Sequence, residues 1–290
     1  MDQAEKLRNL VGQIKPPSAN PDSPMRVISI TSGKGGVGKT NFALNLAIYL
    51  AKTGKRITVI DADFGLANVE VLLGVSPRYT FKDVLSGQVE LLDALTLGPE
   101  GVRFLSGGSG LAQLADITES QLSVILSGFT QLEEVTDILI IDTGAGINKA
   151  VINFLKASHE IIVVTTSDPT AIADAYAVIK TISDDNVDAP QLKIVINRVE
   201  NQNEGVEVFG RLQRVCTRFL SVNPISLGNI PYDKYLSKAV KSQEPVALMY
   251  PYAESSKCIE SICRKLLNEP ELETTSVRRF IDRWVGFIKG

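Results

Sequence analysis

The fold is determined by a glycine-rich segment, Gly33-Lys34-Gly35-Gly36-Val37-Gly38-Lys39-Thr40, which fits the pattern G-x-x-x-x-G-K-[ST]. It follows a β-branched run at Val27–Thr31 and precedes a helical stretch at Thr40–Lys52, so it joins a strand to a helix. Glycines let backbone N–H groups close around phosphate oxygens, and the helix directs its positive N-terminal end at the same anion. We therefore expect a phosphate-binding loop in which Lys39 reaches the β- and γ-phosphates and the Thr40 hydroxyl binds Mg²⁺.

Short apolar runs alternate with helical stretches along the middle of the chain. The runs that we expect to be strands are Val27–Thr31, Lys55–Ile60, Val102–Leu105, Ile138–Ile141, Glu160–Thr165, Leu192–Ile196 and Ile225–Ile230. Because most of these runs are continuously apolar, they indicate strands that are buried on both faces. The alternation predicts an α/β fold: a doubly wound, mostly parallel sheet with helices on both faces, spanning residues 25–268.

Composition limits the classes of function. The 290 residues include 30 Lys plus Arg and 33 Asp plus Glu, a net charge of −3, which does not favour a globally basic nucleic-acid surface. The three cysteines, Cys216, Cys258 and Cys263, do not form a disulfide framework and indicate a reducing compartment. The first ten residues lack the apolar core of a signal peptide, and no apolar run reaches about 18 residues, so we expect a cytoplasmic protein that does not span the membrane.

Two appendages flank the predicted domain. Residues 1–24 comprise a short amphipathic helix and a linker with four prolines, which cannot continue a helix. Residues 269–275 form a second, polar linker, and residues 276–290 form a final helix. On a helical wheel its apolar side chains fall in one arc: Val277, Phe280, Ile281, Trp284, Val285, Phe287 and Ile288.

The opposite arc of this final helix carries four basic residues and one acid, which favours an anionic membrane surface. At ~1.5 Å per residue the helix is shorter than the ~30 Å apolar core of a bilayer, so we expect it to lie in the interface. A single helix of this kind binds weakly, but two on one dimer act together. The alternative is a helix that docks on its own domain.

Carboxylates follow two of the expected strands. Asp61 and Asp63 come after Lys55–Ile60, and Asp142 ends the apolar run Ile138–Ile141. The second arrangement is the Walker B pattern, in which we expect Asp142 to hold the Mg²⁺ shell. His159, the one histidine, starts an expected strand and is interpreted as structural. The chemistry then depends on positioning and charge neutralisation, as in phosphoryl transfer.

Lys34, directly after the first glycine of the loop, resembles the signature of the deviant Walker A ATPases. That family includes septum-placement ATPases (MinD), plasmid-partition ATPases (ParA), nitrogenase iron protein and iron–sulfur carriers. The resemblance implies a slow ATPase that dimerises with ATP, with Lys34 reaching the nucleotide of the other subunit. It also implies that Asp61-Ala62-Asp63 belongs to switch I, where Asp63 orients the attacking water and Asp61 supports Mg²⁺.

Two further segments resemble functional loops of the same family. Thr143-Gly144-Ala145-Gly146 resembles switch II, which senses the γ-phosphate, although family members often have a proline here. Asn197-Arg198 resembles the pair that reads adenine, and Pro231-Tyr232-Asp233 the loop that closes over the base. The guanine-reading motif N-K-x-D is absent at this position, so ATP and ADP are the expected nucleotides, with Mg²⁺.

The N-terminus is similar to one MinD-like branch, the flagellar number regulators (FlhG, also called YlxH). The element that carries this resemblance is Asp2-Gln3-Ala4 followed by Leu7-Arg8. Asp168-Pro169-Thr170 followed by Asp174-Ala175-Tyr176 resembles the same branch. The resemblance implies a regulator of flagellar placement and number that stimulates the SRP-type GTPase FlhF through its N-terminal helix, with Gln3 offered to the partner.

The same resemblance implies contacts with flagellar switch-complex (C-ring) proteins and reversible association with the inner face of the plasma membrane. Two alternatives stay open. A DNA-partition ATPase would need a basic dimer face for phosphate contacts, which the net charge of −3 does not favour. An iron–sulfur carrier would need cysteines paired across a dimer, commonly C-x-x-C, whereas Cys258 and Cys263 are separated by four residues.

Overall fold

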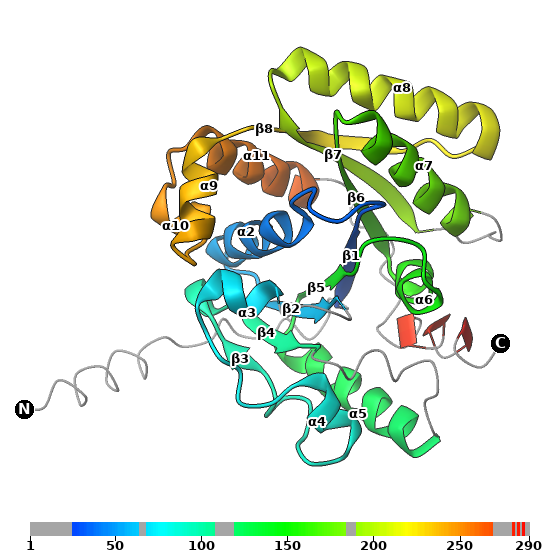
Figure 1. The fold of residues 1–290 in the computed structure, drawn as a ribbon. Helices are drawn as coiled ribbons and strands as arrows, with labels where there is room; N and C mark the ends of the chain where they lie inside the picture. Colours follow the sequence, from blue (N-terminus) through cyan, green and yellow to red (C-terminus); the bar gives the residue numbers. More distant parts are fainter. Residues whose placement is uncertain are drawn as a thin grey trace, which may run out of the picture.

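A computed structural model of the chain describes residues 25–63, 68–107, 119–183, 190–268 and six residues of the C-terminal segment: 280, 281, 283, 284, 286 and 287. Its centre is an eight-stranded sheet with the order β3-β4-β2-β5-β1-β6-β7-β8 (Figure 1). The strands are β1 (Arg26–Thr31), β2 (Ile57–Ala62), β3 (Thr96–Leu97), β4 (Arg103–Ser106), β5 (Ile138–Thr143), β6 (Glu160–Thr166), β7 (Gln191–Val199) and β8 (Ile225–Pro231). All neighbouring pairs are parallel except β3 with β4, which confirms the doubly wound, mostly parallel sheet.

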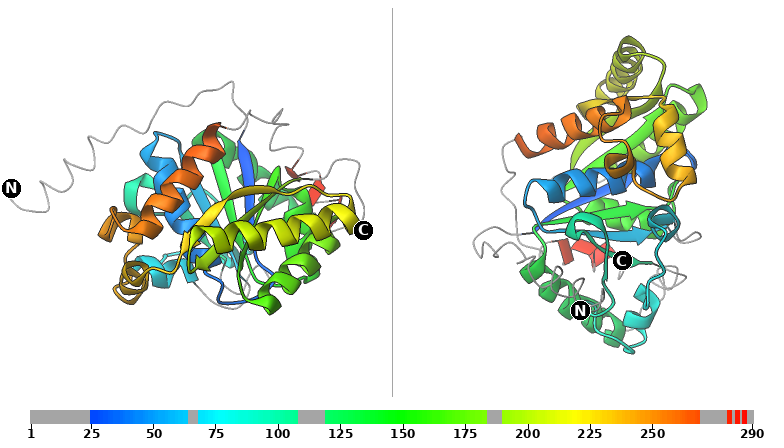
Figure 2. Two further views of the ribbon diagram at one scale, coloured as in Figure 1. Left: turned by 90° about the horizontal axis from the view of Figure 1, so that it is seen from above. Right: turned by 90° about the vertical axis from the view of Figure 1, so that its left-hand side faces the viewer.

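Helices cover both faces of the sheet. They are α2 (Lys39–Lys52), α3 (Asn68–Leu73), α4 (Phe81–Leu85), α5 (Glu119–Val135), α6 (Lys149–Ala157), α7 (Pro169–Ser183), α8 (Gln202–Leu220), α9 (Lys234–Lys241), α10 (Val246–Met249) and α11 (Glu254–Asn268), with a short 3-10 turn at Pro99–Gly101. Alternate residues of the strands enter different cores: Ile140 of β5 packs with α2 and α11, whereas Leu139 packs with α5 and α6. Figure 2 shows α2 and α11 on one side of the sheet and α5 on the other.

The strands lie close to the expected runs, with differences at their ends. The second strand was expected at Lys55–Ile60 but extends over Ile57–Ala62, so Asp61 lies inside the strand and its side chain is buried. β3 was not expected at all, because a strand of two residues at the edge of the sheet leaves no periodic signal. The expected helix Thr40–Lys52 begins one residue earlier, at Lys39.

The C-terminal helix is docked on the domain. Phe280, Ile281 and Trp284 are buried in the core beneath α5 and α6. The Trp284 ring stacks on Phe154 of α6, with the ring centroids 4.9 Å apart, and lies 6.2 Å from Phe129 of α5. In the described state these three side chains pack against the protein, which is the docked alternative that the sequence left open. Binding of the apolar arc to lipid stays a prediction. Figure 1 shows this segment beside α6.

Several sequence-based expectations lie outside the described residues. They include the N-terminal element with Asp2, Gln3, Ala4, Leu7 and Arg8, the linker at 269–275, and Val277, Val285 and Ile288 of the final helix. Phe287 is described and its carbonyl oxygen accepts a hydrogen bond from the Asn153 amide of α6 at 3.2 Å. Within the described part of the chain, every helix is too short or too polar to cross a membrane.

A buried charge cluster anchors the end of the sheet where β1, β6 and β7 begin. The Glu160 carboxylate accepts hydrogen bonds from the Arg26 guanidinium and, at 2.6 Å, from the Lys193 ammonium group, and both Glu160 and Lys193 are almost fully buried. Burial alone would raise the pKa of Glu160, but Arg26 and Lys193 hold it below its ordinary value. Arg26 also donates to the Leu266 carbonyl at 3.2 Å, which ties the last turn of α11 to β1.

Replacing Glu160 with Gln is expected to lower the free energy of unfolding at pH 7 by about 3–5 kcal/mol, because Arg26 and the buried Lys193 lose their ion pairs with this carboxylate. The lowered pKa means that the wild-type contribution is present above the ordinary carboxyl value of 4.5 and is lost as the pH falls below it. Urea unfolding at pH 7 and pH 4 measures both effects. The matched control is Glu207→Gln, which breaks an exposed pair with Arg211 and should change little. Equal effects of the two variants would contradict the role of the cluster.

Candidate nucleotide-binding site

The phosphate loop lies between β1 and α2, as the sequence predicted. Gly36 and Gly38 have φ angles of 78° and 93°, a left-handed conformation that residues with a side chain rarely adopt. A Cβ atom on Gly33 would lie 2.1 Å from the backbone carbonyl carbon of Asp174, so the loop packs directly against α7. The loop therefore needs glycine both for its turn and for its close approach to a neighbouring helix.

Lys39 and Asp142 form the charged centre of the site. The Lys39 ammonium group donates to Asp142 Oδ1 at 2.9 Å, and both side chains are buried. Burial raises the pKa of the Asp142 carboxyl, and the charge of Lys39 opposes this shift. Asp142 Oδ2 is buried and accepts no hydrogen bond from the described residues. An oxygen of this kind fits a water molecule of a Mg²⁺ shell.

A second buried carboxylate lies beside Asp142. Asp61 of β2 is the register partner of Asp142 of β5, and burial together with the charge of Asp142 raises its pKa to about 7. Its oxygens accept hydrogen bonds from the backbone N–H groups of Asp63, at 3.1 Å, and Val69, at 3.3 Å. Two adjacent buried carboxylates require positive charge, and Thr40 in the first turn of α2 supplies a hydroxyl of the type that binds Mg²⁺. This donor set fits the predicted magnesium site.

The two expected switch segments are in contact. A Cβ atom on Gly144 would lie 3.3 Å from Asp63 Oδ1, so switch II passes directly beside the carboxylate that is expected to orient water. The Gly144 N–H donates to Ala62 O at 3.3 Å, and the Gly146 N–H donates to Ser32 O at 3.0 Å. Thr143, where the family often has proline, ends β5 and donates to Ile30 O at 3.1 Å. Both switches are thus fixed to strand ends at the same edge of the sheet.

Lys34 contacts its own chain in the single subunit. Its ammonium group lies 2.8 Å from Thr170 Oγ1 and 3.2 Å from Asp168 Oδ2, at the start of α7. Both charged side chains are about half exposed, so these contacts contribute little energy and can be exchanged for others. The arrangement leaves Lys34 accessible for the predicted contact across a dimer.

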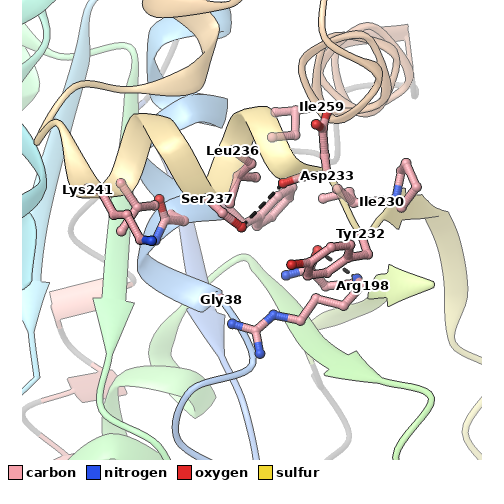
Figure 3. Close-up of a pocket in the computed structure, with 14 residues that line it drawn as sticks. Gly38, Arg198, Ile230, Tyr232, Asp233, Leu236, Ser237, Lys241 and Ile259 are labelled. Carbon is pink, nitrogen blue, oxygen red and sulfur yellow. Dashed lines mark hydrogen bonds between the residues drawn. The ribbon is translucent and has the colours of Figure 1, made fainter. Parts of the chain in front are cut away.

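The expected base-reading residues line a cavity of about 370 Å³ (Figure 3). Asn197 and Arg198, at the end of β7, and Pro231, Tyr232 and Asp233, after β8, all contribute to its wall. Tyr232 is 70% exposed at the rim. The Asp233 carboxylate is occupied: it caps α9 through the Tyr235 N–H and also accepts hydrogen bonds from Ser255. Asp233 therefore shapes the loop rather than offering a free oxygen to the cavity.

One wall of this cavity was not predicted from the sequence. Figure 3 shows that α9 supplies Leu236, Ser237 and Lys241, and Val240 completes this wall. Their spacing places them on one helical face, which is a weak signal that no motif reinforces. Of the three cysteines, Cys216 and Cys263 are buried inside helices α8 and α11, and Cys258 is half-buried. Two buried thiols do not reach a surface where a cluster could be shared between subunits.

Comparisons with known proteins agree with this geometry. The family described as "ParA: NUBPL iron-transfer P-loop NTPase" matches residues 24–267. The chain therefore belongs to the ParA family of P-loop NTPases, and it is an ATPase with a MinD-like fold. Among solved structures, the septum site-determining protein MinD complexed with Mg-ADP from Pyrococcus horikoshii gives a TM-score of 0.69 at 22% identity, covering 87% of this chain and 99% of that one.

Two relatives show which members of the family this chain is similar to. The antiactivator FleN of Pseudomonas aeruginosa is 39% identical over 247 residues, which is 85% of this chain and 88% of that protein. The flagellum site-determining protein YlxH of Helicobacter pylori is 36% identical over 276 residues, covering 93% of this chain and 92% of that protein. The sequence-based resemblance to the flagellar branch is thus confirmed over most of the chain.

Replacing Asp63 with Ala is expected to slow ATP hydrolysis at least about 10²-fold, because the attacking water loses its positioning group. Nucleotide affinity should change less than threefold, since the phosphate loop is untouched. Phosphate release and titration with a fluorescent ATP analogue measure the two quantities. Asp93→Ala, at an exposed turn away from the site, serves as the control for general effects of removing a carboxylate. A parallel loss of binding and hydrolysis in Asp63→Ala would contradict the assignment.

Proposed function

We propose that this ATPase is a nucleotide-switched regulator of flagellar placement and number. The observation that carries the proposal is the likeness to the flagellar proteins FleN and YlxH over 85% and 93% of the chain, combined with a phosphate loop that carries the signature Lys34. The described site supports ATP as the ligand, because a base-sized cavity opens beside the phosphate loop.

The positions of the side chains support the following catalytic cycle. Lys39 binds the β- and γ-phosphates once ATP displaces its contact with Asp142, and Asp63 places water at the γ-phosphate. Thr40, Asp142 and Asp61 would hold Mg²⁺, which would supply neutralisation of charge on the phosphates. Lys34 leaves Asp168 and Thr170 and reaches the nucleotide of a second subunit, which makes the dimer depend on ATP.

The C-terminal helix links this ATPase cycle to reversible binding of the membrane. It docks through Trp284 on Phe154 of α6, and α6 begins at Lys149, three residues after switch II ends at Gly146. Movement of switch II toward a γ-phosphate therefore pulls on the helix that forms the dock. Release of the C-terminal helix presents its apolar arc and its basic arc to an anionic membrane surface, with two helices for each dimer.

The resemblance of the N-terminal element to the flagellar branch supports two further parts of the proposal. Residues 2–8 stimulate an SRP-type GTPase, FlhF, and the folded domain binds C-ring proteins of the flagellar switch. The protein then acts in the cytoplasm and associates reversibly with the inner face of the plasma membrane. Stimulated GTP hydrolysis by FlhF, with and without Gln3→Ala, tests the first part directly.

Liposome co-sedimentation is the first test of the proposed switch. With vesicles of phosphatidylglycerol and phosphatidylethanolamine, the intact chain is expected to bind at least several-fold better with Mg-ATP than with Mg-ADP. A chain that ends at Thr275 should lose binding with either nucleotide, because the helix is absent. Lys34→Ala should bind at the ADP level with both, since the dimer does not form.

The control for the lysine variant is Lys257→Ala, which removes an exposed lysine of α11 away from the site. It should behave like the wild type. Binding that ignores the nucleotide would make the helix a passive anchor. No lipid binding at all, together with an ATP-dependent gel shift of DNA at low salt, would favour the DNA-partition alternative.

A further inference from the structure

Asn197 makes a hydrogen bond that is not needed for recognition of a nucleotide base. Its side-chain Nδ2 donates to the carbonyl oxygen of Val37, inside the phosphate loop, at 2.7 Å. Its Oδ1 accepts from the backbone N–H of Arg198 at 2.9 Å. Asn197 is 7% exposed and lines the base cavity, so the amide links this cavity to the phosphate loop.

Backbone groups on both sides fix which way the amide points. A carbonyl oxygen only accepts and an N–H only donates, so Nδ2 must face Val37 and Oδ1 must face Arg198. Arg198 lies in an irregularity of the pairing between β7 and β8 and has a φ angle of 57°, which turns its N–H back onto the preceding side chain. If the amide were reversed, Oδ1 would face the Val37 carbonyl oxygen, and Nδ2 would face the Arg198 N–H. Both pairs would repel each other in a buried site, which is costly.

The contact with Val37 also acts on the next peptide group. In a planar trans peptide the C=O and N–H groups point in opposite directions. Holding the Val37 oxygen toward Asn197 therefore directs the Gly38 N–H away from Asn197. The packing is tight, because a Cβ atom on Gly38 would lie 2.4 Å from Asn197 Nδ2. The amide thus restrains the orientation of a peptide whose N–H belongs to the phosphate-binding loop.

We propose that Asn197 is a positioning residue for the phosphate loop in addition to facing the base. This inference rests on the proposed binding of nucleotide at this site. The amide sets the Val37–Gly38 peptide before any ligand arrives, so that the Gly38 N–H meets a phosphate oxygen without reorganisation. The residue therefore contributes to the binding of phosphates even when no base is present.

The hydrogen-bonding groups of the Asn197 amide that Val37 and Arg198 do not use favour adenine over guanine. One N–H of Nδ2 and one lone pair of Oδ1 stay available for the cavity, and they match N7 and the N6 amino group of adenine. The fixed order of donor and acceptor admits adenine in one orientation only. Guanine presents two acceptors, N7 and O6, along the same edge, so Oδ1 would oppose O6. One side chain thus couples the choice of base to the geometry of the loop.

The test uses inorganic tripolyphosphate, which has the phosphates of ATP and no base. Calorimetric titration of the full chain with Mg²⁺ and tripolyphosphate is compared for the wild type, Asn197→Ala and Asn197→Leu. Both variants remove the donor to Val37 without adding charge, and Leu keeps the approximate shape of Asn. Each should bind tripolyphosphate about tenfold more weakly or worse, since a misdirected N–H loses a charge-assisted hydrogen bond. Two variants of different size are used, with thermal unfolding as a check on folding.

Tyr232→Ala is the matched control within the same cavity. It is expected to weaken ATP binding while leaving tripolyphosphate binding unchanged, because Tyr232 lies at the exposed rim. Unchanged tripolyphosphate affinity in a folded Asn197 variant would overturn the positioning role and leave the proposed function standing. A wild-type chain that bound neither tripolyphosphate nor ATP would overturn both.

Discussion

The hydrogen bond between the Lys39 ammonium group and Asp142 Oδ1 joins the loop after β1 to the end of β5, its neighbour in the sheet. A buried ion pair is stable only when its remaining oxygens are satisfied, and Asp142 Oδ2 accepts no hydrogen bond from the described residues. The pair therefore holds the site in a state that is ready to exchange protein contacts for phosphate and metal contacts. Asp142 occupies the ammonium group that the phosphates of ATP would bind, and Lys39 occupies the carboxylate that Mg²⁺ would face.

The parallel sheet places the other parts of the site around this pair. Carboxyl ends of parallel strands meet at one edge, which is where α/β proteins bind ligands. Asp61 reaches Asp142 through the register of β2 and β5, and Asn197 reaches the phosphate loop from the end of β7. The opposite edge carries the Arg26, Glu160 and Lys193 cluster, which fixes the strand starts.

The sequence predicted the sheet and the phosphate loop because both depend on local patterns: continuous apolar runs and glycines at fixed spacing. It predicted the strand of Asp61 two residues too early, since Lys55 and Arg56 begin a run that pairs only from Ile57. The wall of the base cavity on α9 escaped prediction because Leu236 and Ser237 approach Asn197 only in the folded chain. The dual contact of Asn197 was hidden for the same reason: Val37 is 160 residues away.

The apolar arc of the C-terminal helix shows why periodicity alone does not identify the surface that a helix covers. An arc of Phe, Ile and Trp gains about 1.5–3 kcal/mol for each large side chain buried, whether in protein or in lipid. Phe280, Ile281 and Trp284 together thus hold the dock with about 5–9 kcal/mol before ordering costs. Moving a two-state equilibrium from 1:99 to 99:1 takes about 5.5 kcal/mol. A shift of α6 would release the helix only if it removed most of this burial, and α6, which carries Phe154, begins at Lys149, three residues after switch II ends at Gly146.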